Sequence, residues 1–421
     1  MDVLVVGSGG REHALCRAFR RSPKAGKLYC ASGNAGIAQD AECVAIAPDD
    51  IKALADFAQS RNIGLTFIGG EVPLALGVGD EFAARGLNAI APSRDASQLE
   101  SSKSFAKDFM ARHGVPTPRY VTAHSPDFAI LELESGDFGD ESAPVVVKAD
   151  GLAAGKGVVV AKNRADAIAA ISGMSELVGT AAAEKIVLEE CLTGHEVSLL
   201  AFVDGENFAL MPPVRDHKRI GDGDTGPNTG GMGTITDASL LNGDELTQIT
   251  EAVIRPTLHG CIREGFRYRG VLFLGLMMTK DGPQLLEYNV RFGDPETQAI
   301  LVRLEADLVD ICGSMISGTL ASSEIKWRPG SSACVVLAAE GYPGKVRTGD
   351  VIDGAQDMPT GVEVFHAGTA LDPQHRFITN GGRVLGVTAA GDDLASTLDL
   401  VYSGVGRISW PGMQYRHDIG K

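Results

Sequence analysis

Short apolar runs alternate with helix-like stretches at the start of the chain. The apolar runs, which predict strands, lie at 3–6, 27–31 and 65–70. The stretches that predict helices lie near 11–21, 49–60 and 74–85. Because strands that alternate with helices form βαβ units, the pattern predicts an N-terminal Rossmann-like domain with a parallel sheet at 1–100.

The pattern changes near residue 100. A helix is expected from Asp95 to His113, because Pro116 and Pro118 follow it and prolines interrupt helices. Strand-like runs then follow one another at 145–149, 157–162, 185–190, 195–203 and 270–279. Strands joined by short turns favour antiparallel pairing, so the sequence predicts an α+β region at 101–325.

The end of the chain is predicted to form a small C-terminal β-rich domain. A polar stretch that contains proline and glycine lies at 322–332. Short strand-like runs with tight turns follow it at 333–344, 363–369 and 377–389. We place this domain at 326–421 and expect a multi-domain protein of the α/β and α+β classes.

Charge and cysteine content narrow the class of protein. The formal net charge of −16 disfavours nucleic acid as a partner, because binding to a polyphosphate relies on excess lysine and arginine. The seven cysteines are scattered singly, which argues against a disulfide framework and against a zinc site. The apolar run at 3–6 is too short for a signal peptide or a membrane span, so we expect a cytoplasmic protein without a membrane partner.

The motif GSGGREHAL at 7–15 follows a predicted strand and opens a predicted helix. The free N–H groups at such a helix start can bind an anion. A dinucleotide fingerprint needs a glycine where Glu12 stands, and an acidic residue after the second strand, where 29–32 has none. NAD binding is therefore not expected, and a tight βα turn without a ligand is the alternative.

The motif KADGLAAGKGVVV at 148–160 combines two lysines with glycine turns. Lys148 stands at the end of a strand, and Lys156 stands in a Gly/Ala loop. The motif is not a Walker A loop, because Gly157 follows Lys156 where that loop has serine or threonine. The pattern favours a flexible hairpin over a phosphate chain, and a plain hairpin with solvated lysines is the alternative.

The motif LLEYNVRFGDPETQ at 285–298 begins as a strand. Its alternation places Glu287 and Asn289 on one face, with Arg291 beyond them. Two oxygen ligands suit Mg²⁺, which usually keeps waters and takes its other ligands from substrate phosphates. A strand with a solvated polar face is the alternative.

The stretch DHKRIGDGDTGPNTGGMG at 216–233 gathers charge and glycine without a long apolar run. We expect it to lie outside the core. Glycine-rich backbone can approach a ligand closely and rearrange at little cost. The stretch is predicted to be a mobile lid over an anionic substrate, and a disordered surface loop is the alternative.

These motifs, with SGNAG, GYPG and TNGGRVL, resemble the phosphoribosylamine–glycine ligase family, also called glycinamide ribonucleotide synthetases, within the ATP-grasp superfamily. The resemblance runs nearly end to end. It implies an ATP-grasp region at 101–325 with a mobile lid subdomain at about 119–190. The end of the chain at HDIGK shows no linker, which favours a free-standing protein, and we expect a monomer. The resemblance also implies that ATP, glycine and 5-phosphoribosylamine give glycinamide ribonucleotide, ADP and phosphate through glycyl phosphate in purine biosynthesis.

The resemblance also implies roles for individual residues. ATP contacts fall on Lys103, Lys148, Lys156, Glu189, Cys191, Leu192 and Glu196. Mg²⁺ or Mn²⁺ is held by Glu287 and Asn289, and the catalytic residues are Arg291, Asp294 and Lys148. Substrate contacts fall on Gly9, Gly10, Glu71, Asp216, Lys218, Arg219, Asn228, Thr229, Gly230, Gly231 and Asp294.

Other functions are weighed against this one. A carboxylase or formyl-transferring relative with the same fold is disfavoured by the stretch at 216–233. A nucleotide-binding oxidoreductase is disfavoured by Glu12. A catalytically silent binding protein is disfavoured because Lys148, Glu287, Asn289 and Arg291 are all present.

Overall fold

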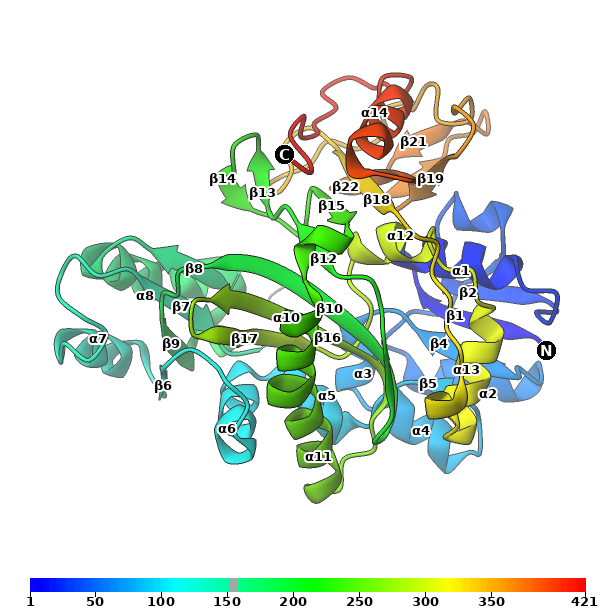
Figure 1. Cartoon of the computed structure of the whole chain (residues 1–421). Coiled ribbons are helices and arrows are strands. Elements are labelled where there is room, and N and C mark those ends of the chain that lie inside the picture. The colour runs from blue at the N-terminus through cyan, green and yellow to red at the C-terminus, as the bar shows by residue number, and fades with distance from the viewer. Residues whose placement is uncertain (152–156) are drawn as a thin grey trace.

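The structure, a computed structural model, describes residues 1–151 and 157–421 (Figure 1). The N-terminal part contains a parallel sheet in the order β3-β2-β1-β4-β5, which confirms the predicted parallel sheet. Its strands are β1 (Val3–Gly7), β2 (Leu28–Ser32), β3 (Glu42–Val44), β4 (Leu65–Ile68) and β5 (Ala89–Ile90). Its helices are α1 (Gly10–Arg20), α2 (Ile51–Ser60), α3 (Glu71–Ala75), α4 (Val78–Ala84) and α5 (Arg94–Ser101).

Two helices predicted as continuous are each divided into two. The one expected at 74–85 is interrupted by Gly77, whose φ of +90° is in the left-handed region that glycine adopts at little cost. The one expected from Asp95 to His113 is interrupted at Ser102, between α5 and α6 (Lys103–His113). Ser102 is extended, and its hydroxyl accepts a hydrogen bond from the amide of Phe105, so it begins a new helix.

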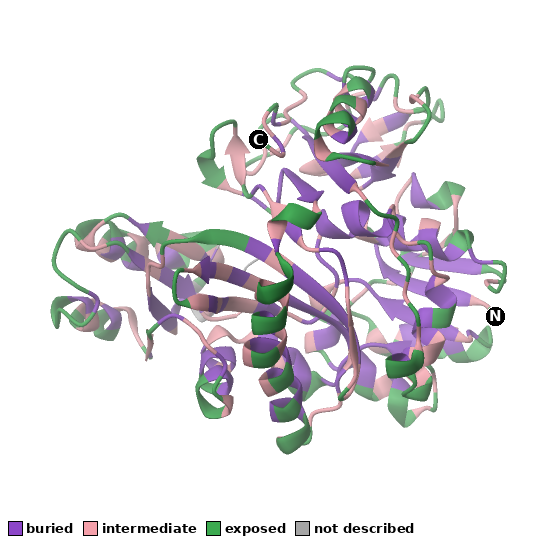
Figure 2. Ribbon diagram, viewed as in Figure 1, coloured by how far each residue is buried: buried purple, intermediate pink, exposed green. Residues whose placement is uncertain are grey.

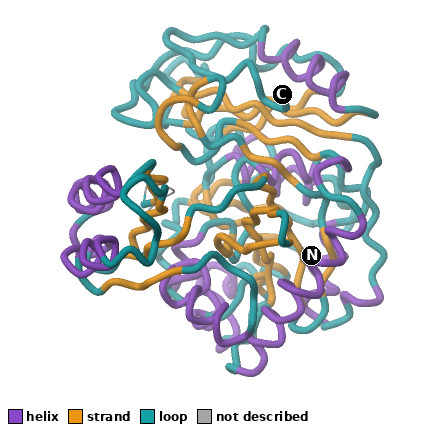
Figure 3. Tube along the Cα trace, turned by 60° about the vertical axis from the view of Figure 1, so that its left-hand side comes forward, coloured by secondary structure: helices purple, strands orange, loops and turns teal. Residues whose placement is uncertain are grey.

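A small unit stands apart from the rest of the chain (Figures 1 and 3). It contains an antiparallel sheet in the order β6-β9-β7-β8 and its own buried apolar cluster. The strands are β6 (Tyr120–Ala123), β7 (Val145–Ala149), β8 (Val158–Ala161) and β9 (Ile186–Glu190). The helices are α7 (Pro126–Glu134), α8 (Arg164–Val178) and α9 (Thr180–Ala183).

A long antiparallel sheet joins the centre of the molecule to its C-terminal part. Its order is β17-β16-β10-β12-β15-β18-β22-β19, and β11 pairs with β10. The central strands are β10 (His195–Asp204), β11 (Phe208–Leu210), β12 (Val214–Asp216), β15 (Gly233–Thr236), β16 (Arg269–Thr279) and β17 (Gly282–Asn289). The C-terminal strands are β18 (Ser331–Ala338), β19 (Val362–His366) and β22 (Arg383–Gly391). Since β15 pairs with β18, hydrogen bonds cross the predicted boundary at 325, and the domain limits stay predictions.

Further elements cover this sheet or project from it. The helices are α10 (Gly243–Ile249), α11 (Arg255–Arg263), α12 (Glu296–Leu301), α13 (Leu308–Ser317) and α14 (Leu394–Val405). The hairpins are β13 (Arg219–Gly221) with β14 (Thr225–Asn228), and β20 (Thr369–Leu371) with β21 (Phe377–Thr379). Short 3₁₀ turns lie at Ile37–Gln39, Ala238–Leu240 and Leu320–Ser322, and a π turn lies at Thr250–Ile254.

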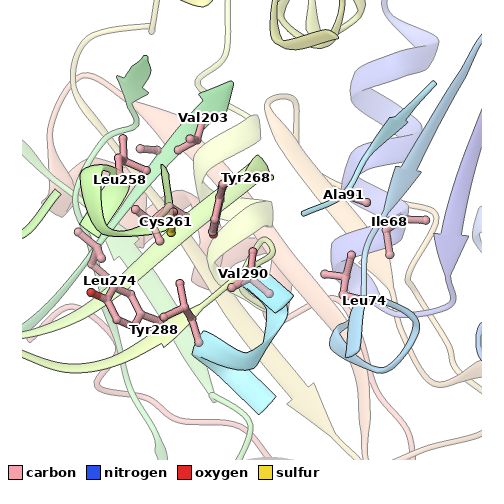
Figure 4. Packing of buried hydrophobic residues seen from close by; sticks show 14 of the residues in the cluster. Ile68, Leu74, Ala91, Val203, Leu258, Cys261, Tyr268, Leu274, Tyr288 and Val290 are labelled. Atoms are coloured by element: carbon pink, nitrogen blue, oxygen red, sulfur yellow. The ribbon is translucent and has the colours of Figure 1, made fainter. Parts of the chain in front are cut away.

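The N-terminal and central parts share one apolar core. Buried residues line the contact between them (Figure 2). Ile68 and Leu74 of the N-terminal part belong to the same buried cluster as Leu258 and Tyr288 of the central part (Figure 4). Such packing holds the sheet edges in fixed positions, so side chains from both parts can form one site. Within the described residues, no helix has both the length and the apolar character needed to cross a bilayer.

Candidate active site

Three lysines from separate elements surround the carboxylate of Glu287 on β17. Lys103 is the first residue of α6, Lys148 lies on β7, and Lys218 lies between β12 and β13. Burial alone raises the pKa of the Glu287 carboxyl, but these ammonium groups outweigh burial and the pKa lies below its usual range. Lys148 is buried, Lys103 is partly buried and Lys218 is exposed. Several positive charges near one carboxylate are suited to a polyanion such as a phosphate chain.

Lys148 is held in place by two contacts. Its ammonium donates to the carbonyl of Leu286 at 3.1 Å, where β17 has an irregular register with β16. It also lies 2.7 Å from Glu189 Oε1, and Lys107 lies 3.1 Å from the same oxygen. Burial lowers the pKa of Lys107 to about 8, although Glu189 opposes the shift. Sequence reasoning missed Lys107, because it stands in the middle of α6 outside any motif.

Arg291 connects the end of β17 to the N-terminal part. Its Nη2 donates to Asn289 Oδ1 at 3.0 Å and lies 2.8 Å from Glu100 Oε1. Its buried Nε makes no hydrogen bond within the described residues, and the Glu71 carboxylate is 3.4 Å away. A buried donor whose nearest acceptor is at ion-pair distance can form a shorter hydrogen bond to a substrate anion if Glu71 moves aside. Glu100, which also accepts from the amide of Val290 at 2.8 Å, was not predicted.

The residues present fit a divalent ion that binds together with phosphates. The described part of the chain contains no cluster of three or more His, Cys, Asp or Glu side chains that could hold a metal alone. Glu287 and Asn289 offer two oxygen donors beside the three lysines. Mg²⁺ usually takes one or two protein carboxylates and completes its shell with water and phosphate oxygens.

The remaining predicted ATP residues lie around this cluster. Lys103 donates to the carbonyl of Gly151 at 3.1 Å, and burial lowers the pKa of its ammonium. Glu196, at the start of β10, lies 3.3 Å from Lys218. Cys191 and Leu192 follow β9 and are partly buried. Lys156 lies outside the described residues.

A second cluster surrounds a cavity of about 330 Å³ between the N-terminal and C-terminal parts. Asp294 and Arg383 line it together with Gly9 and Asn34. Arg383 Nη1 donates to the carbonyls of Gly230 and Asp294, and its Nη2 donates to Asp294 Oδ2 at 3.1 Å. Burial alone raises the pKa of Asp294, but Arg383 and Arg11 outweigh it. Arg383 belongs to the TNGGRVL motif, yet the sequence did not indicate that it contacts the site.

Gly9 lines this cavity, Gly10 follows it in the chain, and both lie next to Asp294. The amide of Gly9 donates to Glu12 Oε2 at 2.6 Å, so one free N–H of the helix start is already paired. A Cβ atom on Gly10 would lie 2.5 Å from Gln298 Nε2. Close packing between α1 and α12 is therefore sufficient to explain the glycine at position 10.

The stretch at 216–233 is not wholly outside the core, which corrects our expectation. Its two ends join the long sheet through β12 and β15, and His217 is 6 % exposed. Burial and the nearby Glu296 carboxylate together raise the pKa of Asp216 to about 8. The charge and glycine content predicted an exposed segment. Polar residues can be buried here because they have partners within the fold.

The middle of the same stretch is the β13–β14 hairpin. Arg219 Nη1 donates to the carbonyl of Gly226 at 2.6 Å, and Arg219 pairs with Asn228 across the hairpin. These two residues therefore contact their own hairpin, whereas Lys218 reaches the lysine cluster. Thr229 Oγ1 donates to the carbonyl of Lys218 at 2.8 Å. Gly231, with φ of +105°, packs against Asp216 and Pro295.

The buried imidazole of His217 predicts a loss of stability in acid. Its Nδ1 lies 3.1 Å from the carbonyl of Gly233, and its Nε2 accepts from the amide of Gly420, so the ring is neutral. Burial lowers its pKa from 6.5 to about 4. The unfolded chain therefore binds a proton that the folded chain does not, and stability falls as the pH drops from 6.5 towards 4.

We expect this residue to contribute on the order of 3 kcal/mol to that loss. His217→Asn should show a smaller fall in the free energy of unfolding across the same pH range, measured by urea titration. His124→Asn, at an exposed histidine, is the control and should keep the wild-type slope. Equal pH slopes for wild type and His217→Asn would contradict the prediction.

Family models for phosphoribosylglycinamide synthetase match three parts of the chain. The N domain matches residues 1–100, the ATP-grasp (A) domain matches 101–297, and the C domain matches 332–421. The phosphoribosylamine–glycine ligase of Yersinia pestis is 47% identical over 428 residues, which cover 100% of this chain and 98% of that protein.

Solved structures with the same fold agree with this match. The phosphoribosylamine–glycine ligase from Thermotoga maritima has a TM-score of 0.86 at 33% identity and covers 100% of both chains. The biotin carboxylase domain of a Hydrogenobacter thermophilus 2-oxoglutarate carboxylase, solved with MgADP and bicarbonate, has a TM-score of 0.74 at 15% identity. That alignment covers 98% of this chain and 91% of the other, and it shows a likeness of fold alone.

Proposed function

Because the chain belongs to the phosphoribosylglycinamide synthetase family, we propose that it ligates glycine to 5-phosphoribosylamine in an ATP-dependent reaction of purine biosynthesis. The observation that carries the proposal is the group of lysines beside β17. Lys148 donates to the carbonyl of Leu286 at 3.1 Å, and Lys103 and Lys218 lie near Glu287. These groups provide a site for a triphosphate beside a second, polar cavity that can hold the acceptor.

The reaction follows from the chemistry of a carboxylate. A carboxylate oxygen of glycine attacks the γ-phosphorus, the bond to the β–γ bridging oxygen breaks, and ADP leaves. The nitrogen of phosphoribosylamine then attacks the carbonyl carbon of glycyl phosphate, phosphate leaves, and the nitrogen loses a proton. Both steps depend on positioning and charge neutralisation rather than on a protein nucleophile.

The nucleotide residues act by charge and position in this proposal. Lys103 and Lys148 bind the phosphates, and Glu189 holds Lys148 at 2.7 Å. Lys156, Cys191, Leu192 and Glu196 contact the nucleotide. Arg291 directs its unused Nε to the transferred phosphoryl group, which gains negative charge as it moves. Mg²⁺, held by Glu287 and Asn289, neutralises the phosphate charge when bound.

The proposed acceptor contacts come from both clusters. Gly9 and Asp294 line the second cavity, whereas Lys218 lies near Glu287 and Glu71 lies beside Arg291. Asp294, Asp216 and Lys218 contact glycine, and Gly9, Gly10 and Glu71 contact phosphoribosylamine. Thr229, Gly230 and Gly231 complete the contacts with both acceptors, while Arg219 and Asn228 act through the β13–β14 hairpin. We propose that a single chain is the active unit. Measurement of the molar mass by light scattering during gel filtration tests this.

Measurement of ADP formation tests the proposed function. We expect turnover only when ATP, Mg²⁺, glycine and phosphoribosylamine are all present, with glycinamide ribonucleotide formed in equal amount. Bicarbonate and formate in place of glycine are the controls and should give no turnover. ADP formation with either of them would assign the chain to another reaction class of the same fold.

A further inference from the structure

The C-terminal segment, residues 414–421, contacts the β13–β14 hairpin through a buried arginine. The side chain of Arg416 is 2 % exposed. It donates to the two oxygens of Asp418 from Nε at 2.7 Å and from Nη2 at 2.8 Å. Its Nη1 donates to Asp224 Oδ1 at 2.6 Å and to the carbonyl of Arg219 at 3.3 Å. One guanidinium therefore connects the segment to both the tip and the base of the hairpin.

Backbone hydrogen bonds surround this ion pair. The amide of Gly223 donates to Asp418 Oδ2 at 2.7 Å, and the amide of His417 donates to Asp222 Oδ1 at 2.8 Å. The amide of Gly420 donates to His217 Nε2 at 3.2 Å. The segment thus contacts the hairpin tip and the residue before its base, although the tip itself is exposed to solvent.

The position of the hairpin bears directly on the candidate site. At its base, the amide and the hydroxyl of Thr229 both donate to the carbonyl of Lys218 at 2.8 Å. Lys218 then extends towards Glu196, whose Oε2 lies 3.3 Å from its ammonium nitrogen. Just beyond Thr229, Gly230 accepts from Arg383 at the second cavity. A displacement of the hairpin therefore moves groups in both clusters.

The β13–β14 hairpin has few internal contacts that would keep it in one conformation. Glycines stand at 221, 223 and 226, and Asp224 has a left-handed φ of +54°. Glycine-rich backbone loses much conformational entropy when it is ordered, and an exposed two-stranded hairpin is marginal in water. The buried guanidinium, which is paired with two carboxylates, supplies contacts that the hairpin lacks.

We propose that Arg416 is a positioning residue for the ligation reaction. It stabilises the conformation of the β13–β14 hairpin in which Lys218 and Gly230 face the substrates. This inference rests on the proposed function, because it assigns the two clusters to ATP and the acceptors. When only a fraction of molecules holds the competent conformation, apparent affinity falls by that fraction.

The test compares Arg416→Met and Asp224→Asn with wild type. Asp224 is 71 % exposed, and asparagine tolerates a left-handed φ, so Asp224→Asn keeps the fold even if Arg416→Met does not. We expect faster amide hydrogen exchange at 219–228 in the free enzyme. We also expect KM for glycine and phosphoribosylamine to rise about tenfold in Arg416→Met, with kcat retained at saturation. Arg416→Lys should recover part of the effect.

Each outcome decides the proposal. A kcat loss with unchanged KM and unchanged exchange would assign Arg416 to general stability and overturn the inference. Unchanged KM in folded Asp224→Asn, with faster exchange, would also overturn it. Arg347→Met is the control, because Arg347 pairs with Asp350 at 2.9 Å in the same part of the chain without contacting the hairpin. If wild type used another acceptor, the proposed function would fail, and the KM comparison would be made with that acceptor.

Discussion

Glu287→Ala is expected to lower kcat by ~100-fold or more, with a much smaller effect on folding. The variant removes a carboxylate that lies near Lys103, Lys148 and Lys218, and with it a proposed ligand of the divalent ion. The half-saturating Mg²⁺ concentration should rise in parallel, because Asn289 alone is a weak ligand. Steady-state ADP formation at varied Mg²⁺ measures both effects.

Thermal unfolding separates this role from a structural one. If Glu287 serves only to balance the lysines, turnover and melting temperature should fall together. Glu264→Ala is the matched control, because Glu264 is also a paired carboxylate, at 2.9 Å from Arg112, and belongs to neither cluster. A Glu287→Ala enzyme with normal turnover, or one that is inactive only because it is unfolded, would contradict the assignment.

The sequence was sufficient to predict the sheets but not the interruptions in the helices. Apolar runs predict the strands, because a strand buried on both faces is continuously apolar and a strand buried on one face alternates. The segments between the runs then favour parallel or antiparallel pairing. Ser102 and Gly77 end helices through backbone geometry instead. A serine or glycine within a helical pattern can either continue the helix or end it, so only the three-dimensional structure identifies these two breaks.

The candidate site was predictable where a motif carries its own chemistry. Lys148, Glu287 and Asn289 belong to motifs, and the structure brings them together at one end of β7 and β17. Their roles stay predictions. Lys107 and Glu100 could not be found in this way, because their importance comes from long-range contacts with Glu189 and Arg291. A single lysine within a helix is otherwise read as a solvated residue.

The contacts of the stretch at 216–233 could be predicted only in part, for the same reason. Its glycines and charges indicate contact with ligands, and Lys218 does reach the lysine cluster. The C-terminal segment that holds the hairpin is far away in the sequence and has an ordinary composition. Contacts between distant segments are set by the whole fold, which local pattern does not specify.

Arg291→Lys is expected to lower kcat ~100-fold while KM for ATP changes by no more than about threefold. Arg291 contacts Glu100, Asn289 and the carbonyl of Phe292 with its two terminal nitrogens, and its Nε, 3.4 Å from Glu71, is the proposed donor to the phosphoryl group. A lysine has one ammonium on a flexible stem and cannot serve all of these partners. The loss falls on kcat because charge on the transferred group is greatest in the transition state.

Arg112→Lys provides the comparison for this substitution. Arg112 contacts Glu264 with Nε at 3.0 Å and Nη2 at 2.9 Å, so it is also an arginine that hydrogen bonds hold to a carboxylate. The pair is exposed, and its loss should leave kcat and KM unchanged. If single-turnover measurements showed equal rates of phosphoryl transfer in the two variants, Arg291 would hold β17 in place without acting on the phosphoryl group. A large difference between them, at similar melting temperatures, is the expected result.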